Sequence, residues 1–312
     1  KKTVEQQNID QVIITTDKIS QKRKNEVFNF FKLQGVKIFT VPAIDKWANS
    51  QGIVGNLKPI IIEDLLRRDA IDIDLQKNVL QYQDKTILVT GAAGSIGSEI
   101  VRQLLKFKPH KLILFDQAET PLFDLKNELF KAKHTTQFEF LLRSVSNYAS
   151  VEQCFKAHAI DVVFHAAAYK HVFMTETTPA AAVLNNILGT KNVVDLAIKN
   201  AVGHFVMVST DKAVNPSNVM GASKRIAEMY VANQAEASNT QLITTRFGNV
   251  LGSNGSVVPI FKEQIAKGGP VTVTHPEITR FFMTITEACQ LVLEAGATGT
   301  GGEIYVFDMG AP

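Results

Sequence analysis

Residues 208–224, VSTDKAVNPSNVMGASK, combine side chains that can transfer protons with a strand, loop and helix pattern. Asp211 and Lys212 are adjacent, and a positioned acid and base can deliver one proton and remove another. Met220 and Lys224 are four residues apart in the expected helix, so they share one helix face. The segment predicts proton-transfer chemistry, with a solvated ion pair between Asp211 and Lys212 as the alternative.

Met220 is the unexpected residue of this segment. Dehydrogenases built on a nicotinamide-binding α/β sheet often have Tyr four residues before such a Lys, whereas Met has no proton to give or take. Either the chemistry is absent from this chain, or a residue other than the one at position 220 carries it.

A glycine-rich turn in LVTGAAGSIGSEI, residues 88–100, follows a predicted strand and opens a predicted helix. Gly91, Gly94 and Gly97 are spaced so that the backbone can approach a pyrophosphate at the positive end of the helix. A glycine trio alone also fits a tightly packed turn. The surrounding strand and helix favour a dinucleotide site.

Asp116 closes the next predicted strand, LILFD (112–116). A carboxylate at this place accepts hydrogen bonds from the adenosine ribose hydroxyls and repels a 2′-phosphate. No Arg or Lys occupies residues 92–96 to favour that phosphate, so NAD is expected rather than NADP. The small side chains of HAAAYKH (165–171) would let the backbone lie close to the cofactor, although simple tight packing explains them too.

The elements that position these residues alternate between strand and helix, which predicts an α/β fold with a doubly wound, parallel Rossmann-type sheet. We expect a truncated α/β segment and linker over 1–83, a NAD-binding domain over 84–247 and a smaller substrate-binding lobe over 248–312. The predicted strands of the sheet are TILVTG (86–91), LILFD (112–116), FEFLL (138–142), VVFHAAA (162–168), HFVMVST (204–210) and LITTRF (242–247), and VIITT (12–16) and VKIFTVP (36–42) precede them.

The composition is that of an ordinary globular protein. The 312 residues are 45% hydrophobic and 20% charged, and the net charge of +3 is too small to favour nucleic acid or an acidic membrane surface. Cys154 and Cys289 show no metal-ligand or disulfide spacing, so we expect no metal site and a reducing, cytoplasmic location. The chain opens with KKTVEQQ and no Met, so a fragment of a longer, membrane-anchored parent is an option.

The chain from about residue 86 resembles the extended short-chain dehydrogenase/reductases, and more narrowly the bacterial UDP-N-acetylglucosamine 4,6-dehydratases of capsule, O-antigen and glycan biosynthesis. Even 1–85 resembles the segment that joins membrane helices to the catalytic domain in large members, most clearly at IEDLLRRD (62–69). The motifs that carry the resemblance are TGAAGSIGSE (90–99), HAAAYKHV (165–172), NILGT (186–190), STDKAVNPSNVMGASKR (209–225), RFGNVLGSNGSV (246–257) and TRFFMT (279–284).

Two departures from the family pattern stand out. FMTE (173–176) replaces the usual Pro and Leu-Met-Glu run, and Arg143-Ser144 replaces the Gly-Asp that usually follows the third strand. The second departure puts an expected adenine contact in question. The Met at position 220 is not a departure, because the large members resemble this chain in placing Met there.

The resemblance implies a lyase that uses tightly bound NAD. NAD would oxidise the sugar at carbon 4, water would be lost across carbons 5 and 6, and hydride would return to carbon 6. Asp211 would act as base for the 4-hydroxyl and then as acid for the departing 6-hydroxyl, while neutral Lys212 would take the proton from carbon 5. Thr210 would bind the 4-oxygen, and Lys224 would hold the nicotinamide ribose.

The resemblance also implies the remaining site residues, with a UDP-sugar as substrate, no nucleic acid partner, and membrane contact only through segments outside this chain; a homo-oligomer is left open. The residues expected at the cofactor are Gly91, Gly94, Ser95, Ile96, Gly97, Asp116, Ala166, Ala167, Ala168, Asn186, Ser209 and Lys224. Those expected at the substrate are Lys170, His171, Asn249, Val250, Ser256, Val257, Thr272, Thr274, Arg280 and Glu303.

Two other functions stay open at this point. A nucleotide-sugar 4-epimerase would return hydride to carbon 4 without elimination, but it needs no acid at the 6-hydroxyl. A NAD-binding regulator would have lost catalysis together with the Tyr. The adjacent acid and base favour the dehydratase over both.

Overall fold

A computed structural model describes residues 9–14, 23, 26–27, 30–31, 36–40, 58–59, 75–253, 255, 257–273 and 275–310. The chain forms two compact units, Lys1–Ala70 and Ile71–Pro312. In the first unit, β1 (Gln11–Ile14) pairs in parallel with β2 (Lys37–Thr40), and β3 (Lys58–Pro59) pairs antiparallel to β2. These strands match the predicted strands near 12–16 and 36–42, and the segment 62–69 that resembles large family members lies outside the described residues.

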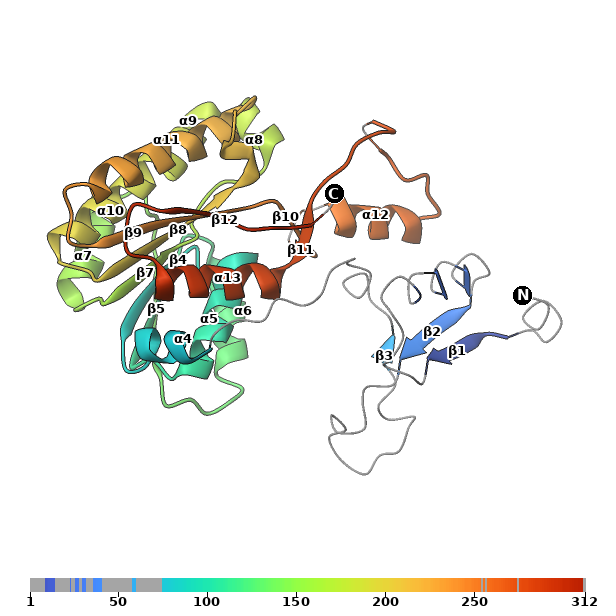
Figure 1. Cartoon of the computed structure of the whole chain (residues 1–312), viewed down its shortest axis with the longest axis horizontal. Coiled ribbons are helices and arrows are strands. Elements are labelled where there is room, and N and C mark those ends of the chain that lie inside the picture. The colour runs from blue at the N-terminus through green and yellow to red at the C-terminus, as the bar shows by residue number, and fades with distance from the viewer. Residues whose placement is uncertain are drawn as a thin grey trace. The chain divides into compact units, whose positions relative to one another are not determined.

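The second unit has an α/β fold around a parallel sheet (Figure 1). Among the described residues the sheet has seven strands, and β4 lies between β5 and β7, so the chain winds outward in both directions from it. All six strands predicted for this sheet are present. In spatial order the strands are β12 (Ile304–Val306), β9 (Gln241–Phe247), β8 (His204–Thr210), β7 (Val162–His165), β4 (Thr86–Thr90), β5 (Lys111–Asp116) and β6 (Gln137–Leu142).

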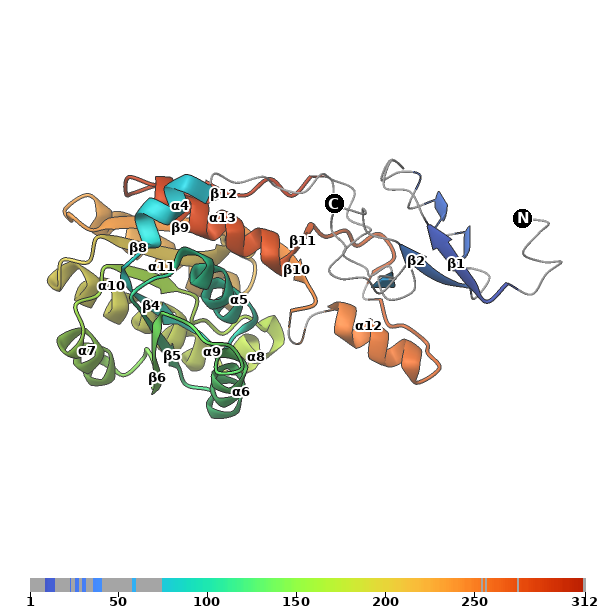
Figure 2. The same cartoon turned by 90° about the horizontal axis from the view of Figure 1, so that it is seen from below.

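Helices cover both faces of this sheet, because side chains of each strand point alternately to one face and the other. On β8, for example, Val206 packs in one hydrophobic cluster and Phe205 and Met207 pack in the other. The first cluster includes α4 (Leu75–Tyr82), α5 (Ser95–Leu104), η3 (Leu105–Phe107), α6 (Glu119–Leu129) and α13 (Ile285–Thr298), and the second includes α7 (Tyr148–Ala157), α10 (Gly189–Lys199) and α11 (Val219–Ala235) (Figures 1 and 2).

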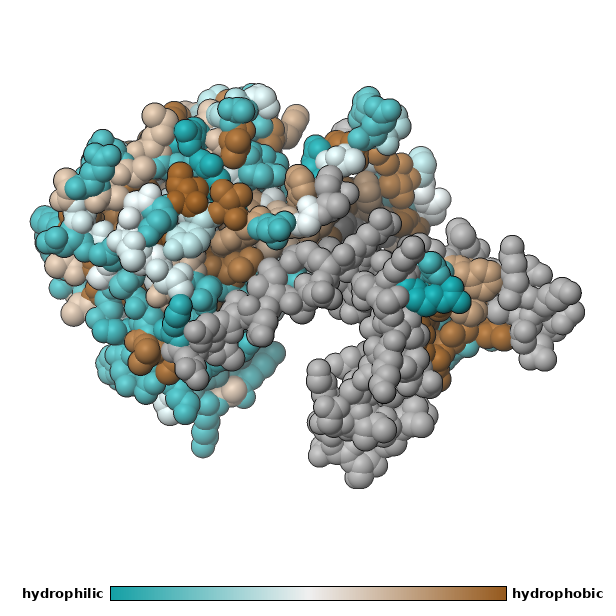
Figure 3. Space-filling view, viewed as in Figure 1, coloured by the Kyte–Doolittle hydropathy of each residue, from teal (hydrophilic) through white to brown (hydrophobic). Residues whose placement is uncertain are grey.

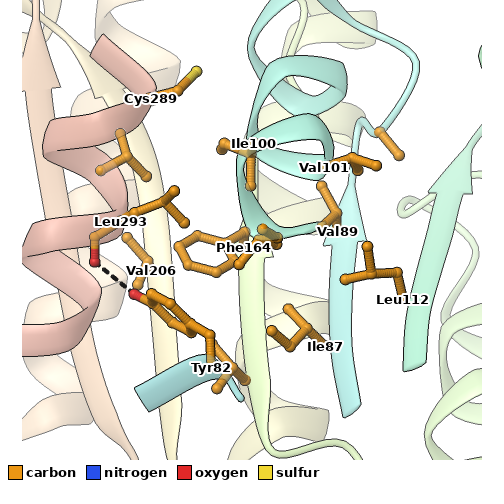
Figure 4. Packing of buried hydrophobic residues seen from close by; sticks show 14 of the residues in the cluster. Tyr82, Ile87, Val89, Ile100, Val101, Leu112, Phe164, Val206, Cys289 and Leu293 are labelled. Carbon is orange, nitrogen blue, oxygen red and sulfur yellow. Dashed lines mark hydrogen bonds between the residues drawn. The ribbon is translucent and has the colours of Figure 1, made fainter. Parts of the chain in front are cut away.

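Tyr82 shows why the second unit begins before the predicted boundary at residue 83. Its side chain is fully buried beside Phe164 and Val206, and its hydroxyl donates a hydrogen bond to the carbonyl of Leu293 on α13 (Figure 4). Burial raises the pKa of Tyr82 well above its usual value. Helix α4 is therefore part of the core rather than of a linker.

The C-terminal region also differs from the predicted division. A small sheet of β10 (Asn249–Leu251) and β11 (Phe282–Thr284) and helix α12 (Val257–Ala266) follow β9 and form a small lobe. However, α13 and β12 return to the main domain, where β12 pairs with β9. The lobe is therefore an insertion that begins after β9 and ends at β11. The return was hidden because β12 is only three residues long.

No helix among the described residues is both long enough and apolar enough to cross a membrane. On the face drawn in Figure 3, hydrophobic side chains of the second unit are interspersed with hydrophilic ones. Both cysteines, Cys154 and Cys289, are buried and unpaired by disulfides.

Candidate active site

The turn between β4 and α5 has the close backbone packing expected of a phosphate-binding loop. Gly91 has a φ of +67°, and a Cβ on it would lie 2.6 Å from the backbone nitrogen of Ala167. A Cβ on Gly97 would lie 2.0 Å from the carbonyl oxygen of Gly91. Gly94 is the N-cap residue of α5 and has no side chain to cap this helix end. Such an end favours a bound anion.

A cavity of about 250 Å³ opens beside this turn. Asp116 contributes to its wall and accepts hydrogen bonds of 2.9 Å from the backbone nitrogens of Ala93 and Ala118. These bonds hold the carboxylate at the carboxyl end of β5, where a ribose would lie above the turn. The predicted cofactor residues that line the cavity are Gly91, Gly94, Asp116, Ala166, Ala167 and Ala168.

The predicted catalytic residues gather at the carboxyl end of β8. Asp211 Oδ1 accepts hydrogen bonds from Thr210 Oγ1 at 2.9 Å and from Lys212 Nζ at 3.0 Å. Lys212 Nζ also donates to Asn249 Oδ1 at 3.2 Å, which connects this cluster with β10 of the lobe. The side chains of Lys212 and Asp211 are 31% and 39% exposed, so neither charge is buried.

The second oxygen of Asp211 faces Gly248. A Cβ on Gly248 would lie 3.4 Å from Asp211 Oδ2. Among the residues that the structure describes, no hydrogen bond to Oδ2 is found. This oxygen is therefore available to a substrate, while Oδ1 holds Thr210 and Lys212 in place.

Lys224 lies one turn after Met220 on α11, and both side chains are 4% exposed. Burial lowers the pKa of Lys224 to about 8, although the charge of Glu228 acts in the opposite direction. Within the described parts of the chain, the ammonium has no hydrogen-bond or ion-pair partner. A buried cation without a partner is costly, so its retention suits a bound ligand.

A buried ionic network lies behind this lysine. Glu228 has a fully buried side chain and accepts hydrogen bonds from Ser209, Arg225 and Arg246. Burial opposes the ionisation of Glu228, but hydrogen bonds from Arg246 and Ser209 outweigh it and lower the pKa of Glu228. Ser209 is thus committed to α11, and it does not line the cavity beside the glycine turn.

Asn186 also supports the site rather than lining this cavity. The side-chain oxygen of Asn186 accepts a hydrogen bond from the backbone nitrogen of Tyr169 at 2.8 Å. Its side-chain nitrogen donates to the carbonyl of Tyr169 at 3.0 Å and to Ser223 Oγ on α11 at 2.9 Å. The neighbouring Asn185 lines the cavity instead. A π-helical turn, η4 (Val183–Leu188), carries both residues, and its altered period shifts which side chain reaches the cavity.

The predicted substrate residues are less concentrated than the catalytic ones. Asn249 contacts Lys212, whereas Thr272 is exposed and bonds with Gln264 on α12, and Arg280 is exposed and donates to the carbonyl of Thr279. Ser256 and Thr274 lie outside the described residues. The others on the surface or in the lobe are Lys170 and His171, which are exposed, and Val250 and Val257, which lie on β10 and α12.

Glu303 is not brought to the site. Its carboxylate accepts hydrogen bonds from the backbone nitrogens of Thr300 and Gly301, at 2.8 and 2.7 Å, in the turn before β12. That turn lies beside the amino-terminal half of β9, where Gly302 bonds to Leu242, and the catalytic cluster is at the carboxyl end of the strands. The carboxylate of Glu303 therefore stabilises the turn, and the structure does not support the predicted contact between Glu303 and the substrate.

Two features of the site escaped sequence reasoning. Arg143 lines the cavity together with Asp116, although only its departure from the family pattern drew attention to it. The buried pair of Glu228 and Arg246 joins residues that are distant in the sequence. The position of Glu228, four residues after Lys224, was a weak signal that α11 presents a second charge to the same side.

The site can be compared with known proteins. A family model described as "Polysaccharide biosynthesis protein" matches residues 87–312. The chain is 50% identical over 307 residues to capsular polysaccharide biosynthesis protein CapD of Staphylococcus aureus, covering 97% of this chain and 51% of that protein. It is 43% identical to probable polysaccharide biosynthesis protein EpsC of Bacillus subtilis, covering 99% and 52%. The chain therefore spans about half the length of these curated relatives.

Other relatives carry names from nucleotide-sugar chemistry. UDP-glucose 4-epimerase of Rickettsia canadensis is 38% identical over 72% of this chain and 66% of that protein. Among solved structures, Pen from Bacillus thuringiensis matches with a TM-score of 0.70 and 37% identity, covering 73% of this chain and 70% of that one. The dTDP-glucose 4,6-dehydratase DesIV from Streptomyces venezuelae, solved with NAD, shares the fold at a TM-score of 0.64 and 21% identity, over 72% and 76%.

Proposed function

The chain belongs to the polysaccharide biosynthesis protein family, and we propose that it is a NAD-dependent lyase that converts UDP-N-acetylglucosamine to a UDP-4-keto-6-deoxy-N-acetylhexosamine. The observation that carries this proposal is the Asp211–Lys212 pair, held by Thr210 and Asn249 at the carboxyl end of β8. The names of the epimerase relatives and of the dehydratase neighbour support a nucleotide-sugar as the substrate class.

The residues present fit a NAD molecule. The glycine turn leaves no room for side chains where a pyrophosphate would approach, and Asp116 is held where it can bind the ribose hydroxyls. Lys224 has a buried ammonium that suits the nicotinamide ribose. Bound NAD would supply the acceptance of hydride from carbon 4 of the sugar and its return to carbon 6.

Proton transfer would begin at Asp211. Its Oδ2 takes the proton of the 4-hydroxyl as hydride leaves carbon 4. The hydroxyl of Thr210, which donates to Asp211 Oδ1 in the free chain, would turn to the developing carbonyl oxygen. Asp211 is then protonated, so it can serve as an acid in the next step. Met220 takes no part, because a thioether has no proton to transfer.

Elimination would use both members of the pair. The proton on carbon 5 becomes acidic once carbon 4 is a carbonyl, and Lys212 removes it after releasing its ammonium proton to solvent. Asp211 returns its proton to the 6-hydroxyl, which leaves as water, and a double bond forms between carbons 5 and 6. Asn249 Oδ1 orients the amine of Lys212 during this step. When hydride reaches carbon 6, Lys212 returns the proton to carbon 5.

A 4-epimerase is the main competing function, and it is supported by the name of the Rickettsia relatives, UDP-glucose 4-epimerase. Epimerisation needs the base at the 4-hydroxyl but neither an acid at the 6-hydroxyl nor a base at carbon 5. The direct bond between Lys212 Nζ and Asp211 Oδ1 supports elimination, because an acid and a base this close together could act on neighbouring carbons of one sugar.

Incubation of the purified chain with UDP-N-acetylglucosamine and NAD, followed by mass spectrometry and chromatography, tests the proposal. A product lighter by one water supports the dehydratase. Conversion to UDP-N-acetylgalactosamine, which has the same mass and a different retention time, would establish the epimerase instead. If the substrate is unchanged although NAD binds measurably, the chain acts as a NAD-binding protein and the proposed lyase activity is contradicted.

Cofactor choice is a separate prediction. Asp116 should make NAD bind more tightly than NADP. In NADP a phosphate takes the place of the 2′-hydroxyl proton that would be donated to Asp116, and its negative charge would repel the carboxylate. Calorimetric titration should show this gap, and Asp116→Ala should narrow it. Equal affinities in the parent protein would contradict the role of Asp116.

A further inference from the structure

Arg143 lies in the wall of the cofactor cavity, at the end of β6. Its backbone nitrogen donates to the carbonyl of Asp116 at 2.8 Å, so the two residues are neighbours across β5 and β6. Its guanidinium donates from Nη1 to the carbonyl of Ser150 in α7 at 3.1 Å. A guanidinium has five N–H groups, and in the described part of the chain only this one side-chain bond is found. Donors therefore remain for a ligand.

The part of the nucleotide that meets Arg143 follows from the rest of the cavity. The glycine turn at Gly91 and Gly94 takes the pyrophosphate, and Asp116 takes the adenosine ribose. The base must then lie beyond Asp116, away from the glycine turn. Apart from the glycine turn, the three alanines and Asp116, the lining comes from Phe115, Gln117, Ala118, Pro121, Arg143, Val145 and Asn185. Arg143 is the charged side chain of this set.

On the edge that an arginine would contact, adenine presents one acceptor, N7, and one donor, the 6-amino group. Arg donates only, so it cannot pair with the 6-amino group of adenine, which is also a donor. A 6-oxopurine presents two acceptors, O6 and N7, and binds Arg in a bidentate manner. We propose that Arg143 sets the base specificity of this site, so that a dinucleotide with hypoxanthine in place of adenine binds at least as tightly as NAD. This inference depends on dinucleotide binding but not on the sugar reaction.

Calorimetric titration with NAD and with nicotinamide hypoxanthine dinucleotide tests the inference on the chain freed of bound nucleotide. The parent should bind the hypoxanthine compound with equal or higher affinity. Arg143→Gln should reverse the preference toward NAD by about tenfold, since Gln pairs with the 6-amino group and N7 of adenine. Arg143→Lys keeps a positive donor and should keep the parent's preference.

Arg102→Gln is the matched control, because Arg102 is paired with Glu128 and does not line the cavity. It should leave the affinity ratio unchanged, and melting temperatures should show that each variant folds. A parent that binds NAD more than tenfold tighter than the hypoxanthine compound would overturn the inference. So would an unchanged ratio in a folded Arg143→Gln variant. If neither dinucleotide binds the parent, the proposed NAD site fails as well.

Discussion

Two neighbouring residues at the end of β8 lead into two different ionic clusters. Ser209 points to α11 and donates to Glu228 at 2.6 Å in a buried network. Thr210, the next residue, donates to Asp211 at 2.9 Å in an open cluster that includes Lys212. Because side chains of a strand alternate between faces, one strand end supports the fold on one side and presents reactive groups on the other.

The clusters differ in how completely their charges are satisfied. In the buried cluster, Glu228 is fully covered and has three side-chain partners, Ser209, Arg225 and Arg246. In the open cluster, the side chains of Lys212 and Asp211 are each more than a quarter exposed, at 31% and 39%. Exposed ion pairs contribute about 0–1 kcal/mol to the free energy of unfolding. The open pair therefore adds little to stability, which agrees with the catalytic role that we propose for it.

The largest expected effect is on turnover in the open cluster. Lys212→Ala should allow oxidation of the sugar but block elimination, because no base would face carbon 5. Turnover should fall by about 10²–10⁴-fold, the usual contribution of a positioned base. The absorbance of reduced nicotinamide should build up on the enzyme after substrate is added, without release of the 6-deoxy product.

Asp211→Asn separates the two roles of the pair. It removes the base for the first step, so the signal of reduced nicotinamide should itself be suppressed. If Lys212→Ala turns over normally, or if Asp211→Asn still accumulates the reduced cofactor, the assignment of roles is wrong. Normal rates in both variants would make the open cluster an ordinary surface ion pair.

The buried cluster should respond in stability. Glu228→Gln leaves Arg246 in a buried place without its counter-charge, and breaking a buried pair costs about 3–5 kcal/mol. The free energy of unfolding, measured with denaturant, should fall by that amount, whereas Asp211→Asn should change it by less than about 1 kcal/mol. Equal losses in both variants would remove the distinction between the clusters.

Lys224 should make stability depend on pH. Its pKa of about 8 in the folded chain lies below the value of about 10.4 for an unfolded chain. The unfolded state binds the proton more tightly. Below pH 8 burial of the charged Lys224 therefore lowers the stability by its full amount, and this loss disappears as the pH rises through the pKa of the unfolded chain. Lys224→Met should therefore stabilise the protein at pH 7 by about 3 kcal/mol.

Unfolding free energies at pH 7 and pH 10 test this point. The advantage of Lys224→Met should shrink as the pH rises between these values. The same variant should bind NAD more weakly, since Lys224 is assigned to the nicotinamide ribose. A destabilised variant at pH 7 would mean that the ammonium has a partner that compensates its burial.

Sequence reasoning succeeded where a pattern is local. The glycine turn at Gly91 and the strand that ends at Thr210 depend on neighbouring residues, and their positions at the carboxyl edge follow from the parallel sheet. It was weaker where the decisive contact is distant. Tyr82 joins the core through Phe164 on β7 and through α13. Glu228 meets Arg246 because α11 packs on β9. Single residues do not reveal such pairings.

Met220 gives the smallest expected effect and the sharpest contrast with Lys212. Its side chain is 4% exposed, so Met220→Leu, a change of similar volume, should cost less than about 1.5 kcal/mol in stability. Turnover should stay within about tenfold of the parent, because a loss of 10²–10⁴-fold is typical of general acid–base groups. Steady-state kinetics on the two variants measure this directly. A loss for Met220→Leu as large as that for Lys212→Ala would show that the sulfur acts in the reaction, and the division of proton transfer between Asp211 and Lys212 would then be incomplete.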